Sequence, residues 1–129
     1  MKHMGIDYGS KRIGIALSDE SGSIAFPEST IANDERTIGQ IKKLVAGKNV
    51  RKIIMGDTRS TGGAENPITG EAEKFAEELR ERTKLPVEPV FEAWSSIEAS
   101  RHASGNDSHN DAAAAAFILQ RYLDMRQAK

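Results

Sequence analysis

Residues 5–19, GIDYGSKRIGIALSD, indicate two neighbouring β-strands. From Ile13 to Leu17 every second residue is a large aliphatic one, and Gly and Ala stand between them. This period of two is typical of a strand and not of a helix. A Gly-Ser-Lys turn at residues 9–11 separates this strand, residues 12–18, from a strand over residues 2–8. Two strands joined by so short a turn pair antiparallel.

The rest of the chain predicts an alternation of helices and strands. A third strand over residues 23–30 contains Pro27, which favours the edge of a sheet. The later patterns predict, in order, a helix capped by Asn33 or Asp34 and followed by Gly47, a strand over residues 51–56, a helix from 69 or 70 to 83, a strand over residues 85–91, a short helix from 95 or 96 to 103, and a helix from Asp111 to about residue 125. A meander followed by βαβ crossovers predicts an α/β fold, with a mixed five-stranded sheet and helices on both faces.

Composition restricts the class of protein. The 129 residues fit a single domain over residues 1–129. The chain has no cysteine, which excludes disulfides, thiolate catalysis and cysteine-bound metal centres. No apolar run approaches the roughly 20 residues that cross a bilayer, and the first residues lack a signal-peptide core, so we expect a cytoplasmic protein. The net charge of −1 argues mildly against a nucleic-acid partner, although a local basic patch would suffice.

Asp7 is the first candidate site residue. It lies inside a strand apolar enough to be central, where a carboxylate is costly to bury without a cation, hydrogen-bond donors or a metal. A structural role is equally open at this point, with turn amides, Lys11 or Arg12 as the partner of the carboxylate.

Two further acids stand where strands and helices meet. Glu92 ends the strand LPVEPVFE, and such strand ends commonly converge on a ligand crevice. Asp111 opens the final helix, and Asn110 before it is able to act as the cap in its place. Each acid alone is more often a solvated glutamate or a helix-capping aspartate. Carboxylates brought together need cations, and their oxygens suit Mg²⁺ or Mn²⁺, so the three acids predict a metal site for phosphodiester cleavage.

The motifs also resemble those of one known family. The opening GIDYGSKRIGIALSD, the strand RKIIMG, the loop TGGAENP, the segment FEAWSSIEA and the ending NDAAAAAFILQRYLD resemble, in this order, the YqgF (RuvX) family. The resemblance implies an RNase H-like fold and a nuclease that resolves Holliday junctions or matures the 5′ end of pre-16S ribosomal RNA. It implies Asp7, Glu92 and Asp111 as catalytic and metal-binding residues, with Mg²⁺ or Mn²⁺ as cofactor.

The chain departs from the family pattern at two places. Where the family has Asp-Glu-Arg, this chain has Phe91-Glu92-Ala93, and Gly56-Asp57-Thr58-Arg59 replaces the usual Gly-Leu-Pro-like turn. The missing arginine weakens the expected phosphate contacts, and Arg59 or Arg101 could compensate. Nucleic-acid binding is expected from the phosphate contacts of four cationic side chains: Lys11, Arg12, Arg59 and Arg101.

Two other functions remain open at this stage. The Asp-x-Gly hairpin also resembles the phosphate-binding strands of the actin, sugar-kinase and Hsp70 group, but that group needs two such domains. The second alternative is a non-catalytic nucleic-acid-binding or ribosome-associated module with the same fold. The sequence does not choose between structured RNA and branched DNA, nor between a monomer and a homodimer.

Overall fold

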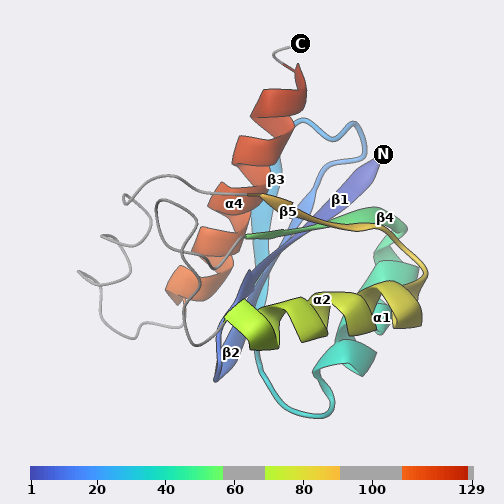
Figure 1. The fold of residues 1–129 in the computed structure, drawn as a ribbon. Coiled ribbons are helices and arrows are strands. Elements are labelled where there is room, and N and C mark those ends of the chain that lie inside the picture. Colours follow the sequence, from blue (N-terminus) through green and yellow to red (C-terminus); the bar gives the residue numbers. More distant parts are fainter. Residues whose placement is uncertain (57–68, 91–108, 128–129) are drawn as a thin grey trace.

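The computed structural model describes residues 1–56, 69–90 and 109–127. A central sheet lies between helices on its two sides (Figure 1). The elements are β1 (Lys2–Tyr8), β2 (Arg12–Ser18), β3 (Ala25–Ala32), α1 (Thr37–Lys48), β4 (Val50–Gly56), α2 (Thr69–Thr83), β5 (Val87–Val90) and α4 (His109–Gln127). The short helix expected from residue 95 or 96 to 103 lies outside the described residues. Within the described ranges, no helix has the length and apolar character needed to cross a membrane.

The sheet has the predicted mixed topology, with the strand order β3-β2-β1-β4-β5. β1 pairs antiparallel with β2, and β2 pairs antiparallel with β3, which confirms the meander. β4 joins the other side of β1 in parallel, and β5 follows β4 in parallel. Pro27 lies in β3, which is an edge strand of the sheet as predicted.

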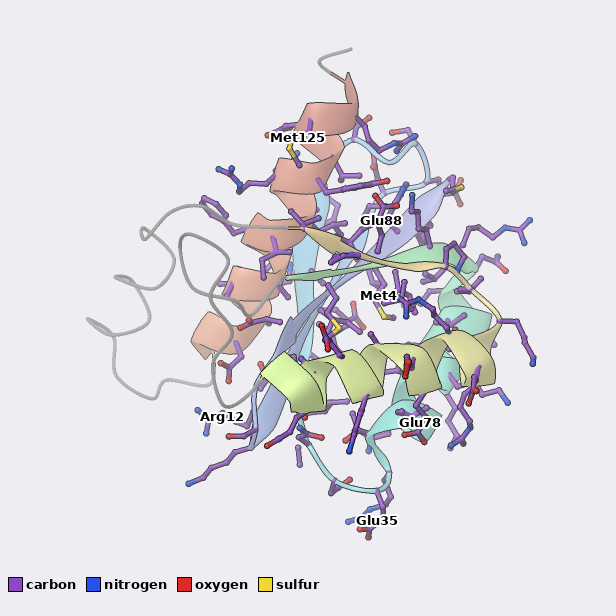
Figure 2. All side chains as sticks on the ribbon, viewed as in Figure 1. Met4, Arg12, Glu35, Glu78, Glu88 and Met125 are labelled. Atoms are coloured by element: carbon purple, nitrogen blue, oxygen red, sulfur yellow. The ribbon has the colours of Figure 1, made fainter. Side chains whose placement is uncertain are left out.

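Two hydrophobic clusters hold the helices against opposite faces of the sheet. The first lies under α1 and α2 and contains Met4 and Ile6 of β1, with Met4 labelled between sheet and helices in Figure 2. The second lies under α4. Because successive residues of a strand point to opposite faces, β1 turns Gly5 and Asp7 toward α4. The face that carries Asp7 is therefore the face that α4 covers.

Glycines on the α4 face allow the helix to lie close to the sheet. A Cβ atom on Gly5 would lie 2.7 Å from the Leu119 Cβ and 2.8 Å from the Ala115 carbonyl oxygen. A Cβ on Gly56 would lie 2.8 Å from the Ile118 side chain. Carbon atoms in favourable contact are about 3.5–4 Å apart, so a side chain at position 5 would push α4 off the sheet, and one at position 56 would require the Ile118 side chain to move.

The ends of α1 differ from the sequence-based expectation. Neither Asn33 nor Asp34 is its N-cap residue, because Asp34 closes a turn before the helix and its carboxylate accepts a hydrogen bond from the Arg36 amide at 2.8 Å. The helix continues past Gly47 to Lys48, and its C-cap residue Asn49 takes the left-handed conformation with a φ of 55°. Asparagine replaces glycine there because it tolerates this conformation better than other side chains do.

Candidate active site

Asp7 lies near the end of β1, on the face covered by α4. Only 8% of it is exposed. Its partner across the antiparallel β1–β2 pair is Gly14, so the two residues share one face of the sheet. β1 places the acid there because Met4 and Ile6, at alternate positions, are buried in the cluster on the opposite face.

Asp111 is brought to the same place by the start of α4. The helix begins at His109, two residues before the predicted start, so Asp111 lies in its first turn as a helical residue. A Cβ on Gly14 would overlap the carbonyl oxygen of Asp111. The backbone of Asp111 therefore contacts Gly14, the residue that pairs with Asp7 across β1 and β2. Two of the three predicted acids thus converge at Gly14, and the helix dipole favours the negative charge of Asp111.

Arg12 pairs with Asp111. Its Nε donates a hydrogen bond to Oδ2 of Asp111 at 2.8 Å, and the two side chains are 42% and 21% exposed. Figure 2 labels Arg12 at the end of the sheet nearest the start of α4. The sequence offered Arg12 as a structural partner for Asp7, its neighbour along the chain. The ion pair that the structure shows instead joins residues far apart in sequence.

Asn33 supports the turn that carries Arg12. Its side-chain amide donates to the Gly9 carbonyl at 2.8 Å, and its backbone amide donates to the Lys11 carbonyl at 3.0 Å. Both ends of the turn are thereby tied to the end of β3. The sequence pattern predicted only a helix-capping role for Asn33. The available signal was an asparagine directly after a strand, since this residue often bonds to loop backbone.

Three predicted site residues, Glu92, Arg59 and Arg101, lie outside the described residues. β5 ends at Val90, which packs in the cluster under α4, and Glu92 follows two positions later in the sequence. Lys11 lies exposed on the turn before Arg12. In the part of the chain that is described, no three His, Asp or Glu residues form a group able to hold a metal ion. Asp7 and Asp111 are the two predicted acids that lie within the described residues.

A second polar cluster lies at the other end of α4. Lys52 binds the Glu88 carboxylate and the Tyr122 hydroxyl, both at 2.7 Å. Buried His3 lies beside Tyr122, with its Nδ1 3.0 Å from the Met1 carbonyl. Burial opposes the charge of Lys52, but its hydrogen bonds to Glu88 and Tyr122 outweigh this and raise its pKa. In this cluster the charge of Lys52 is therefore balanced by Glu88.

Comparison with known proteins places the chain among nucleases. A protein of Bordetella petrii named "Putative pre-16S rRNA nuclease" is 37% identical over 123 residues, which cover 94% of this chain and 93% of that one. A Synechocystis protein of the same name is 35% identical over 133 residues, covering 96% and 88%.

Solved structures share the fold at much lower identity. RuvC of T. thermophilus in complex with a Holliday junction substrate superposes with a TM-score of 0.64 at 13% identity, covering 98% of this chain and 96% of that chain. The fowlpox virus resolvase with Holliday junction DNA gives 0.61 at 10% identity, covering 98% and 99%. The fold is therefore the RNase H-like fold of these resolvases. A sequence model of RuvX, described as Holliday junction resolvase, matches residues 1–125. The chain belongs to the RuvX family.

Proposed function

We propose that this protein is a metal-dependent nuclease that hydrolyses phosphodiester bonds at the site formed by Asp7, Asp111 and Glu92. The observation that carries the proposal is the convergence of Asp7 and Asp111 at Gly14. Two carboxylates that a central strand and a helix start bring to one face of the sheet repel each other, and a bound cation would neutralise this repulsion. Glu92 is the proposed third acid, because in the sequence it follows the end of β5, the strand that lies next to β4.

The donor atoms at this place fit a hard divalent cation. Both acids offer oxygen, the ligand that Mg²⁺ and Mn²⁺ prefer. Asp111 is 21% exposed, so one of its faces remains open to solvent and to a substrate. When bound, such a cation would supply charge neutralisation and water activation for attack on phosphorus. Asp7 and Asp111 would hold it, and Gly14, which has no side chain, allows the backbone of Asp111 to approach the sheet.

Nucleic acid is the proposed substrate, with precursor 16S rRNA ahead of Holliday junctions. The relatives at 35–37% identity over most of the chain carry the rRNA name, whereas the junction-bound structures are only 10–13% identical. Lys11 and Arg12 lie exposed at the turn beside the acids, where they would contact phosphates. Arg59 and Arg101 are proposed to add to this contact. Junction resolution is the second candidate, since the matching family is described by that activity.

A cleavage assay with two substrates tests the proposal. Purified protein is incubated with an RNA containing the 5′ leader of 16S rRNA and with a four-way DNA junction, each in Mg²⁺ or in EDTA. We expect Mg²⁺-dependent cleavage of the RNA that Asp111→Asn removes. Asp124→Asn, an exposed aspartate on the same helix, is the matched control and should retain activity. Binding of RNA without cleavage by any variant would favour the non-catalytic module instead.

A further inference from the structure

The ion pair between Arg12 and Asp111 occupies the carboxylate that the proposed function assigns to a metal. Arg12 is the first residue of β2, and its Nε donates a hydrogen bond to Oδ2 of Asp111 at 2.8 Å. This hydrogen bond uses Nε alone, and the terminal guanidinium nitrogens, which carry most of the N–H donors, are not part of it. With 42% of its side chain exposed, Arg12 can turn these donors toward a ligand in solvent.

Arg12 and a divalent cation compete for Asp111. A guanidinium and a metal ion on the same carboxylate repel each other, and an Arg–carboxylate pair with this much exposure is weak. A divalent cation bound by several acids is therefore able to displace the guanidinium from Asp111 at little cost. The displaced guanidinium remains anchored on the turn that Asn33 ties down, next to the site.

We propose that Arg12 is an exchangeable counter-ion. It neutralises Asp111 in the metal-free protein, and it moves to a phosphate of the nucleic acid once a divalent cation is bound. This inference rests on the proposed function, since it requires that Asp111 bind the metal.

The exchange couples the binding of metal and nucleic acid. A guanidinium released from Asp111 presents its planar pair of donors, which match a phosphate well. Metal binding therefore makes a phosphate-binding group available, and nucleic acid in turn draws Arg12 away from the metal ligand. By thermodynamic linkage each ligand strengthens the binding of the other. Arg12 acts here as a positioning residue for Asp111 in one state and as a phosphate ligand in the other.

The first test measures Mn²⁺ binding by titration calorimetry in the absence of nucleic acid. Arg12→Gln removes the competitor and should tighten Mn²⁺ binding by about two- to fivefold, the scale of an exposed ion pair. Lys11→Gln removes the same charge from the next residue, for which the described part of the chain shows no salt bridge, and should change affinity less. Circular dichroism confirms that both variants fold. Unchanged or weaker Mn²⁺ binding by Arg12→Gln would mean that Arg12 only props Asp111, and would overturn the exchange.

The second test measures the coupling itself with a fluorescent RNA hairpin. Its affinity is measured with and without Ca²⁺, an oxygen-binding cation, and gels confirm that the RNA stays intact. Ca²⁺ should tighten RNA binding by wild type and Lys11→Gln, and much less by Arg12→Gln. Equal gains in all three proteins would overturn the exchange. If Asp7→Asn and Asp111→Asn instead bind Mn²⁺ as wild type does, the proposed metal site itself is wrong, which separates the failure of the function from that of the exchange.

Discussion

The two ends of α4 carry polar clusters of different character. At the N-terminal end, Asp7 and Asp111 converge beside Gly14, and Arg12 pairs with Asp111 near the surface. At the C-terminal end, charged groups contact one another and a tyrosine in a cluster that contains His3, Lys52, Glu88, Tyr122 and Arg126.

The comparison separates a cluster suited to chemistry from one suited to stability. The Lys52–Glu88 pair at the C-terminal end matches charge with charge, and the Tyr122 hydroxyl completes it. At the N-terminal end, Asp7 and the start of α4 meet at Gly14, where the proposed metal would bind to carboxylate oxygens. Substitutions at the N-terminal end should therefore change activity, whereas substitutions at the C-terminal end should change the free energy of unfolding.

Asp7→Asn should have the largest effect on activity. The amide is nearly isosteric but removes the charge that would hold the cation, so cleavage should fall by about a thousandfold or more, as when a catalytic group is lost. The melting temperature without metal should not fall, because the substitution removes the repulsion expected between this carboxylate and that of Asp111. Asp124→Asn is the control. A marked loss of stability with chelator-insensitive activity would make Asp7 a structural aspartate.

Gly14→Ala should damage both activity and stability. The added Cβ overlaps the Asp111 carbonyl and pushes the start of α4 off the sheet, at a cost of about 1–3 kcal/mol, as in overpacked cores. A shift of about 1 Å in Asp111 can lower the cleavage rate by about a hundredfold. Gly39→Ala, in α1 with no atom within 4 Å of its Cβ position, should instead stabilise by about 0.5–1 kcal/mol. Denaturant unfolding and cleavage rates measure both, and a harmless Gly14→Ala would refute the close contact.

Much of the fold was predictable because the first strands have clear local sequence patterns. The alternation from Ile13 to Leu17 and the short turns indicated the meander, and both faces of the sheet are covered as expected. The caps of α1 were not predictable, because Asp34 bonds within a turn before the helix. Asn49 ends the helix although a glycine stood nearby, since sequence patterns do not decide between two residues that both tolerate the left-handed conformation.

The positions of Asp7 and Asp111 in the fold were predictable from the sequence, but the contacts around them were not. The placement of Asp7 in a strand and Asp111 at a helix start followed from local patterns. The partner of Arg12 did not, because the pair joins residues 99 positions apart, and the sequence offered only the nearer Asp7. Gly14 was seen as a small residue in an alternating strand, yet its function is to let the backbone of Asp111 approach.

His3, at the C-terminal end of α4, should make stability depend on pH. Burial lowers its pKa below the ordinary 6.5, and the charges of Arg126 and Lys52 act in the same direction. Above pH 6.5 the contribution of neutral His3 to the free energy of unfolding is fully present. As the pH falls below 6.5, the unfolded chain binds a proton at this histidine before the native state does, so the free energy of unfolding decreases until the pH reaches the lowered pKa. Asp19, whose pKa is lowered to about 2 by hydrogen bonds from the Ser23 and Ile24 amides, titrates well below this window.

Melting temperatures at pH values of about 7.5 and 5.5 measure the contribution of His3. The decrease between them should be smaller in His3→Gln than in wild type, because glutamine does not titrate. Cleavage rates measured at the higher pH should be equal in the two proteins. An identical decrease in both would show that His3 does not control this pH dependence.

Tyr122→Phe should have the smallest effect, and on stability alone. It removes the hydroxyl that accepts the 2.7 Å hydrogen bond from Lys52 and leaves the ring in place. Lys52 keeps its 2.7 Å pair with Glu88, so no cation is left buried without a partner. The loss should therefore lie at the low end of a single hydrogen bond, about 0.5–1 kcal/mol.

Tyr8→Phe is the matched control for this stability measurement. Its hydroxyl lies 3.5 Å from Glu71 on the surface, a contact too long to contribute much, so the free energy of unfolding should stay nearly constant. Cleavage by Tyr122→Phe should stay within about twofold of wild type, since 1 kcal/mol of stability leaves nearly all molecules folded. A larger loss of cleavage would mean that α4 transmits changes from its C-terminal end to Asp111. The two clusters would then be one functional unit, and the distinction between them would fail.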